Sequence, residues 1–376
     1  MGDADFIVIG AGVVGLAAAR ALAGEGARAL VVERRGPGAE ASSAAAGILA
    51  AQAEAAPPLL KLGLLAREHH RRLASLLEAE TGIALDYAPR GLLELAFDDD
   101  GERRLLERAE WQRGQGLAVD VLGADEVREA EPNVSRAVRR ALFFRDDHSV
   151  DNVRLTKALA ASAVSRGAAL LSGRPVTSLV VEKGRVAGVR AGNEVYRAPV
   201  VINAMGAWAG LLGGDPVPPP VEPVRGQMIA FDLSPPLVRH VVYWGHGYLV
   251  PRADGRVLAG STTEQAGFDK SVTAAGLRAI LDIALQIAPI LADVRVADVW
   301  AGLRPGTPDG LPVLGPGTLP GLYQAGGLYR NGILLGPLVG ELVADLARGR
   351  PLPVDLGPFT PARFGLGQAS ASRPTS

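Results

Sequence analysis

The sequence predicts an α/β protein with a Rossmann-like, dinucleotide-binding domain and a second domain built on an antiparallel β-sheet plus helices. Three observations lead to this fold class. A short apolar strand, a glycine-rich turn and an Ala/Leu-rich helix follow one another over residues 6–20. Strands and helices alternate again over residues 151–202, as in a doubly wound sheet. Beyond the Pro-rich segment 215–223, strands follow one another in series, as in an antiparallel sheet.

Three glycines in the first turn form a dinucleotide-binding fingerprint. Gly10 permits the tight turn, Gly12 lets the backbone approach a pyrophosphate, and Gly15 lets the helix pack closely on its strand. The pyrophosphate would lie at the positive N-terminus of that helix. The next strand, 29–32, ends at Glu33, whose carboxylate stands at the spacing of ~20 residues that suits an adenosine ribose. The alternative is a glycine-rich turn without a ligand.

Small side chains fill residues 41–50, a segment that contains Ser42 and Ser43. Such a run lets a flat ring system or a phosphate approach the backbone, and the two hydroxyls can hydrogen-bond to it. An Ala-rich helix packed against its neighbours is the alternative. Beside the fingerprint, we favour contact with the cofactor. Leucines at helical spacing then predict an amphipathic helix over 57–80, with His69 and His70 on its charged, solvated side.

Hydrophobic periodicity and turn residues place the remaining elements. Asp151 is the expected N-cap of a helix that runs to about residue 166, and Val176 is expected to face the adenine edge or the core. Further helices are expected at 100–115, 273–290 and 333–347, and strands at 92–97, 138–144, 169–171, 176–182, 186–190, 200–202, 227–232, 240–244, 248–252, 257–262, 296–303 and 322–325. The Ser/Ala/Gly-rich tail, 365–376, is expected to be disordered.

Composition limits the possible partners. The 376 residues carry a formal net charge of -1, so neither nucleic acid nor an anionic membrane surface is an expected partner. The chain has no cysteine, which excludes disulfides, thiolate metal sites and a flavin linkage through sulfur, and no metal site is expected. No signal peptide is recognised and no uncharged run reaches the ~18 residues of a membrane span, so we expect a cytoplasmic location.

Several motifs in order resemble the D-amino-acid oxidase family of flavoproteins, most closely its glycine oxidase branch. Besides the fingerprint with Glu33, they are the segments 42–48, 246–252, 300–307 and 329–334, and the resemblance covers residues 6–364. It implies non-covalent FAD and a discontinuous cofactor domain with an antiparallel substrate domain over the flavin. The cofactor domain would comprise 1–85, 150–215 and 300–364, and the substrate domain 86–149 and 216–299.

The resemblance also implies the site residues. Nucleotide contacts would fall on the three fingerprint glycines and on Val13, Val14, Glu33, Arg34, Ser42, Ser43, Ala46, Gly47, Ile48, Val176, Leu328, Tyr329, Arg330, Asn331, Gly332, Ile333 and Leu334. Substrate contacts would fall on Tyr248, Arg304 and Arg330. The chain departs from the family pattern at Thr263, because the glycine oxidases that it resembles have a methionine near the substrate at this position. The smaller side chain would leave room beyond the Cα of glycine.

The chemistry of these side chains fits an amino-acid substrate. Arg304 has the planar fork for a bidentate grip on a carboxylate, and Tyr248 can add a hydroxyl donor. Arg330 precedes a helix N-terminus, so it would stabilise the negative charge of a reduced flavin and favour oxygen reduction. His246 would share a strand face with Tyr248 at the pocket entrance. A structural ion pair for Arg304 and a half-buried strand position for Tyr248 are the alternatives.

The family implies an FAD-dependent oxidase of glycine or another small amino acid. Its products would be an oxo acid, ammonia and hydrogen peroxide, molecular oxygen would be the second substrate, and the pathway would be thiamine thiazole synthesis. Three alternatives stay open at this point: a dehydrogenase of the same fold that passes electrons to a quinone or carrier, a flavin-binding module without turnover, and an NAD-dependent dehydrogenase. A homo-oligomer is also left open.

Overall fold

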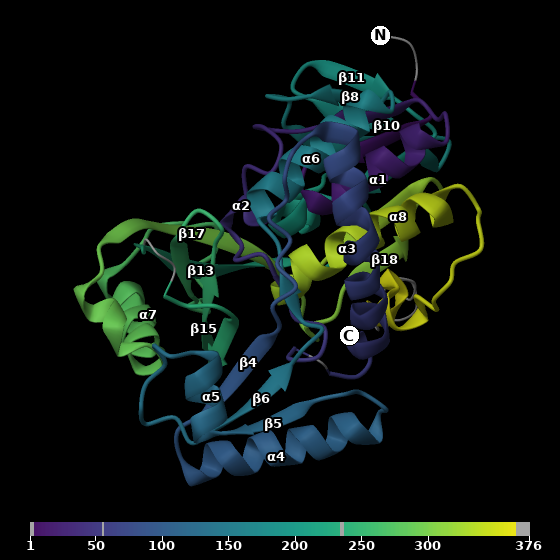
Figure 1. Ribbon diagram of the computed structural model, residues 1–376. Coiled ribbons are helices and arrows are strands. Elements are labelled where there is room, and N and C mark those ends of the chain that lie inside the picture. The colour runs from purple at the N-terminus through teal and green to yellow at the C-terminus, as the bar shows by residue number, and fades with distance from the viewer. Residues whose placement is uncertain (1–3, 55, 234–236, 366–376) are drawn as a thin grey trace, which may run out of the picture.

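The computed structural model describes residues 4–54, 56–233 and 237–365 of the chain (Figure 1). Two large sheets lie side by side, the first with the purple and yellow segments and the second with the blue and green ones. The predicted disordered tail, 365–376, lies outside the described residues except for Gly365. Within these ranges no helix is long and apolar enough to cross a membrane.

The first sheet has the parallel arrangement that the fingerprint predicts. Its strand order is β18-β19-β12-β1-β2-β8, and only β18 pairs antiparallel. The strands are β1 (Phe6–Ile9), β2 (Ala29–Val32), β8 (Ala169–Leu171), β12 (Val200–Asn203), β18 (Val313–Pro316) and β19 (Leu322–Gly326). The helices that pack with one another beside it are α1 (Val13–Gly24), α3 (Leu59–Thr81), α6 (Asn152–Ser165) and α8 (Gly332–Ala347).

The second sheet draws its strands from two distant parts of the chain. Its order is β17-β13-β16-β15-β14-β4-β6-β5, antiparallel except where β14 meets β4. The strands are β4 (Leu92–Ala96), β5 (Asp120–Gly123), β6 (Arg140–Phe144), β13 (Glu222–Asp232), β14 (Val241–Trp244), β15 (Gly247–Pro251), β16 (Arg256–Gly260) and β17 (Val296–Gly306). The helices α4 (Asp99–Gly114), α5 (Ala124–Ala130) and α7 (Ala274–Ile287) pack on it.

Smaller elements complete the fold. A three-stranded antiparallel sheet comprises β9 (Val176–Glu182), β10 (Arg185–Ala191) and β11 (Glu194–Arg197), of which the sequence predicted only the first two. The pair β3 (Ile48–Leu49) and β7 (His148–Ser149) follows the short helix α2 (Ala41–Ala44). Single 3-10 turns are η1 (Gly206–Leu211), η2 (Pro289–Asp293), η3 (Tyr329–Asn331), η4 (Gly357–Phe359) and η5 (Pro361–Phe364).

The two faces of the second sheet belong to different cores. Successive strand residues point to opposite faces, so Leu249 packs with α7 whereas Tyr248 packs on the opposite side with Met228. That opposite side also receives small residues of the 46–53 segment. The strand period therefore turns Tyr248 toward the first sheet, where a site between the two sheets is formed.

Two predictions about helices have different outcomes. Asp151 caps α6 as predicted, because its carboxylate accepts hydrogen bonds from the backbone N–H groups of residues 153 and 154 at 2.9 Å. The prediction that His69 and His70 are solvated is wrong. The side chain of His69 is only 14% exposed and its Nε2 lies 2.8 Å from Glu341, and His70 is only 2% exposed. Its Nε2 lies 2.9 Å from the carbonyl oxygen of Ile333. That carbonyl lacks its usual helical donor, because the residue four positions on is Pro337, which has no N–H.

Candidate cofactor and substrate site

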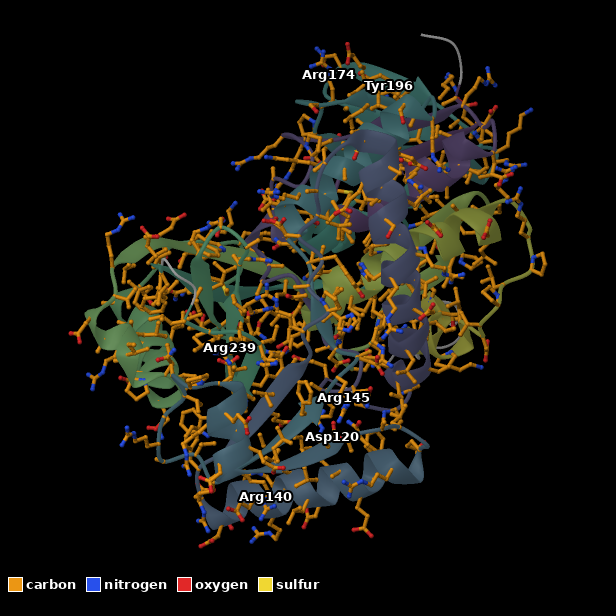
Figure 2. All side chains as sticks on the ribbon, viewed as in Figure 1. Asp120, Arg140, Arg145, Arg174, Tyr196 and Arg239 are labelled. Carbon is orange, nitrogen blue, oxygen red and sulfur yellow. The ribbon has the colours of Figure 1, made fainter. Side chains whose placement is uncertain are left out.

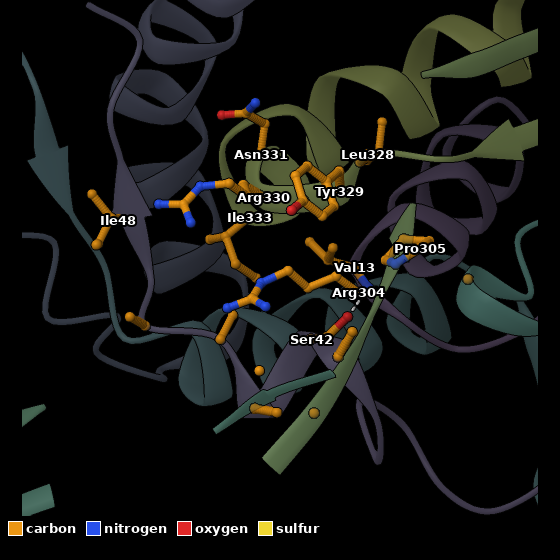
Figure 3. A pocket seen from close by; sticks show the side chains of 18 of the residues that line it. Val13, Ser42, Ile48, Arg304, Pro305, Leu328, Tyr329, Arg330, Asn331 and Ile333 are labelled. Carbon is orange, nitrogen blue, oxygen red and sulfur yellow. Dashed lines mark hydrogen bonds between the residues drawn. The ribbon is translucent and has the colours of Figure 1, made fainter. Parts of the chain in front are cut away.

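An open cavity of about 1150 Å³ lies between the two sheets (Figure 3). Segments from the start, the middle and the end of the chain line it, and nearly half of the lining residues are glycine or alanine. Its charged lining residues are Glu54, Arg304 and Arg330. The cavity therefore combines close access to the backbone with a few converging polar groups, as ligand sites do.

The N-terminal end of α1 forms one wall of the cavity. Gly10 has a φ of +101°, and a Cβ on Gly15 would lie 2.0 Å from the carbonyl oxygen of Gly10. Both positions therefore require glycine. The carboxylate of Glu33 accepts a hydrogen bond from the N–H of Ala11 at 2.8 Å, which fixes the turn to the end of β2. The turn is built for a ligand that approaches the first N–H groups of α1.

The small-residue segment that follows β2 lies against the same helix. The hydroxyl of Ser42 accepts a hydrogen bond from the N–H of Val13 at 3.0 Å, drawn dashed in Figure 3. The indole N–H of Trp300 on β17 donates to the carbonyl of Ala44 at 3.0 Å. These bonds hold the segment between α1 and the second sheet, where its backbone borders the cavity.

A buried arginine fixes the other end of this segment. Arg252, which follows β15, donates to the carbonyls of Val150 and Ala46 and to the side-chain oxygen of Asn152, at 2.8, 3.1 and 2.7 Å. Asn152 in turn donates to the carbonyl of Ser42 at 2.8 Å. The end of β15 is therefore tied directly to the wall that faces it.

Arg304 on β17 extends into the cavity. Its Nη1 donates to the carbonyl of Thr262 at 3.0 Å and its Nη2 to the hydroxyl of Ser261 at 2.5 Å. Across the described ranges it forms no ion pair with a carboxylate. Gly226 on the neighbouring β13 leaves the space that the guanidinium occupies, because a Cβ there would lie 2.3 Å from both Nη atoms. Arg304 is thus a held cation whose charge is available to an anion.

Arg330 enters the same cavity from the turn before α8, as Figure 3 shows. Its Nη2 donates to Glu54 at 3.0 Å, and its Nε donates to the other carboxylate oxygen at 3.3 Å. Burial opposes the charge of this guanidinium, but Glu54 outweighs burial and holds the pKa of Arg330 above its ordinary value. Arg330 is therefore a cation with its own counter-charge, unlike Arg304.

Two tyrosines stand opposite each other on β14 and β15. Tyr243 pairs with Tyr248 in the strand register, with ring centroids 5.7 Å apart. The hydroxyl of Tyr243 donates to Glu54 at 3.2 Å. Burial and the adjacent Glu54 charge raise the pKa of Tyr243 well above its ordinary value, so it stays a neutral donor.

The cavity brings together most of the predicted site residues. Those that line it are Gly12, Val13, Val14, Ser42, Ala46, Gly47, Ile48, Tyr248, Arg304, Leu328, Tyr329, Arg330, Asn331, Gly332 and Ile333. Gly10, Gly15 and Glu33 shape its wall from behind, and Leu334 and Ser43 lie next to lining residues in the chain.

Other predicted residues lie elsewhere. The prediction that His246 shares a strand face with Tyr248 is wrong, because β15 begins only at Gly247 and His246 is exposed in the turn before it. Thr263 does not line the cavity, whereas Ser261, two residues earlier, does. Arg34 stacks on Trp208 at 3.5 Å from the ring centroid and pairs with Glu40. Val176 begins β9 beside the core of the first sheet.

The sequence prediction missed Glu54, Tyr243, Met228, Ser261 and Gly226 among the lining residues. One signal was available for Tyr243. A hairpin with Gly245 and His246 at its turn places Tyr243 opposite Tyr248 and on the same face. Glu54 carried no such signal, because its partners lie 189 and 276 residues along the chain.

The sequence profile of the DAO family, described as FAD dependent oxidoreductase, matches residues 5–346. The chain belongs to this family. Among its relatives, a glycine oxidase of Geobacillus kaustophilus is 36% identical and covers 96% of this chain and 97% of its own. A bifunctional protein ThiO/ThiG of Synechocystis sp. is 34% identical over 96% of this chain and 54% of its own.

Solved structures of the DAO family superpose closely on this chain. The glycine oxidase from Geobacillus kaustophilus has a TM-score of 0.92 at 34% identity, over 96% of this chain and 99% of that one. The iminodiacetate oxidase from Chelativorans sp. BNC1 has a TM-score of 0.86 at 31% sequence identity, over 95% of this chain and 98% of that one. The L-proline dehydrogenase from P.horikoshii has a TM-score of 0.87 at 26% sequence identity, over 97% of this chain and 98% of that one. The chain is an FAD-dependent enzyme of amino-acid oxidation.

The cavity suits the FAD that the DAO family uses. A Cβ on Gly12 would stand at the cavity wall, where Ser42 Oγ, at 3.1 Å, is its one close neighbour among the described residues outside its own turn, so the glycine keeps space open beside α1. The first turn of α1 offers N–H groups to a pyrophosphate. The small residues of the 41–50 segment leave room for a flat ring, and FAD supplies the electron acceptor of the reaction.

Proposed function

We propose that this enzyme oxidises glycine or another small amino acid and transfers the electrons to molecular oxygen. The substrate amine would become an imine, which water hydrolyses to an oxo acid and ammonia, and oxygen would be reduced to hydrogen peroxide. The glycine oxidases among the relatives support this substrate class.

The observation that carries the proposal is the unpaired charge of Arg304. Its guanidinium is fixed by Ser261 and Thr262 beside the cavity, and no carboxylate of the described chain neutralises it. A substrate carboxylate would supply the missing negative charge by forming a bidentate pair with the guanidinium, and the hydroxyl of Tyr248 would add a hydrogen-bond donor. Orientation of this kind contributes several kcal/mol, on the order of 7–11 at best, to lowering the barrier.

The other proposed roles follow from position. The residues of 12–14, 42–48 and 328–333 that line the cavity would contact FAD, with Glu33 behind the turn. Arg330 would act near the flavin, and its pairing with Glu54 reduces the net positive charge that it brings there. His246 and Thr263 lie outside the cavity lining, and we assign them no direct contact with substrate. Ser261, two residues before Thr263, lines the cavity.

A dehydrogenase is the second candidate, because an L-proline dehydrogenase shares the fold at 26% identity. The two candidates differ in the acceptor of the electrons. An oxidase releases hydrogen peroxide in air. In a dehydrogenase, the flavin that the substrate has reduced stays reduced in air. Three expectations stay predictions: a cytoplasmic location, a homo-oligomer, and a reaction product that supplies the synthesis of the thiamine thiazole.

The test is peroxide release by the purified yellow protein in air, with glycine, sarcosine, D-alanine and D-proline. We expect turnover of at least glycine or sarcosine, and about a 100-fold or greater loss of kcat/KM in Arg304→Ala, since a charge-assisted bidentate pair is lost. Turnover of none of the four would refute the substrate class. Full activity of Arg304→Ala would refute the role of the arginine.

A further inference from the structure

The charge of the cavity is decided by three side chains. Arg304 and Arg330 each bring a positive charge, Glu54 brings a negative one, and the described lining residues include no other Asp, Glu, His, Lys or Arg. Glu54 and Arg330 neutralise each other through two nitrogen-oxygen contacts of 3.0 and 3.3 Å. One uncompensated positive charge remains, and it belongs to Arg304.

Glu54 is held firmly in this position. The two contacts with Arg330 engage both carboxylate oxygens, and the hydroxyl of Tyr243 donates to one of them at 3.2 Å. The side chain of Glu54 is only 20% exposed and that of Arg330 25%. A partly buried, doubly contacted pair is screened far less by solvent than a surface pair.

Glu54 also lies close to where the substrate would be held. Tyr243, its hydrogen-bond partner, stands 5.7 Å from Tyr248 between ring centroids. The proposed function places the substrate carboxylate on Tyr248 and Arg304. A second carboxylate in the cavity would therefore meet the negative charge of Glu54, or would have to displace Glu54 from Arg330.

We propose that Glu54 determines substrate specificity by neutralising Arg330, and so restricts this site to amino acids with a single carboxylate. The proposal rests on the proposed function, because it takes the carboxylate anchor to be Arg304. It assigns Glu54 an electrostatic role against the wrong substrate, which is a common way to obtain specificity. An iminodiacetate oxidase shares the fold at 31% identity, so a dicarboxylic amine is a suitable alternative substrate to compare with glycine.

The experiment compares glycine with iminodiacetate on the FAD-loaded protein. In the iminodiacetate reaction one α-C–H hydrogen leaves with its electron pair to FAD, and the amine nitrogen loses a proton. Water then cleaves the C=N bond to glyoxylate and glycine. We expect the wild type to prefer glycine, and Glu54→Gln to raise the ratio of kcat/KM for iminodiacetate over glycine by about tenfold or more.

Two variants serve as controls. Glu54→Asp keeps the charge and should keep the wild-type ratio. Glu80→Gln removes a carboxylate of α3 that is 21% exposed, pairs with Arg20 at 3.1 Å and does not line the cavity, so its ratio should not change. A ratio in Glu54→Gln within about threefold of the wild type, with FAD bound, overturns the proposal.

A binding measurement keeps the proposal testable without turnover. Acetate and malonate carry one and two carboxylates, and their affinities can be read from the change that they cause in the flavin spectrum. We expect malonate to bind the wild type no more tightly than acetate, and to gain about tenfold relative to acetate in Glu54→Gln. Much tighter malonate binding to the wild type overturns the proposal even if Glu54→Gln fails to fold. Failure of the proposed function shows differently, as a wild type that oxidises neither glycine nor sarcosine.

Discussion

Gly226 gives the sharpest way to move Arg304 without removing it. In Gly226→Ala the new Cβ would lie 2.3 Å from both Nη atoms, whereas ordinary contact starts at 3.4 Å. The guanidinium must therefore retreat by about 1 Å from its bonds with Ser261 and Thr262, and a displacement of ~1 Å at a substrate-positioning group costs ~100-fold in rate. We expect kcat/KM for glycine to fall by about that factor.

The assay is steady-state kinetics of Gly226→Ala together with its FAD content. FAD binding should stay at the wild-type level, because the substitution faces Arg304 rather than α1. Gly114→Ala is the matched control, since its Cβ on α4 would have no neighbour within 4 Å among the described residues outside its own helix. A Gly226→Ala enzyme with bound FAD and a kcat/KM within about threefold of the wild type would refute the anchoring role of Arg304.

Three further predictions concern the framework of the site. Gly15→Ala places a Cβ 2.0 Å from a backbone oxygen of the fingerprint turn, so the protein should purify colourless, and a full flavin spectrum would contradict this. Gly340→Ala places a Cβ 2.4 Å from a backbone oxygen of α1, so calorimetry should show a lower Tm from a loss of about 1–3 kcal/mol, and an unchanged Tm would contradict close packing of α1 and α8. Burial, outweighing two backbone hydrogen bonds, lowers the pKa of His70 from 6.5 to about 4. The unfolded chain therefore binds the extra proton between these pH values, and the free energy of unfolding should rise with pH across that window by roughly 3 kcal/mol. Denaturation of His70→Gln across the same pH range should show a flatter slope, and an equally steep one would contradict the assignment.

Local features were predictable because their cause lies in a few adjacent residues. Gly10, Gly12 and Gly15 specify the turn by backbone geometry alone, and Asp151 caps α6 through N–H groups two and three residues away. The period of β15 likewise set which face Tyr248 occupies. Such signals need no knowledge of the rest of the chain.

Features that depend on distant partners were not predictable. Nothing near Glu54 indicates that Arg330, 276 residues away, neutralises it. His70 carries no local sign that α8 contains Pro337 and leaves a carbonyl without a donor. The family resemblance also placed residues 300–306 in the cofactor domain, whereas β17 extends to Gly306 within the second sheet. No break in composition marks residue 300 within this strand.

The most direct test of the account is anaerobic addition of glycine to the FAD-loaded wild type and to Arg304→Ala, followed through the visible flavin absorption. We predict that glycine or sarcosine bleaches the wild-type flavin rapidly, and that the same concentration reduces Arg304→Ala about 100-fold more slowly or not at all. Equal rates of bleaching in the two proteins would contradict substrate anchoring by Arg304. A wild-type flavin that none of the small amino acids reduces would contradict the proposed activity itself.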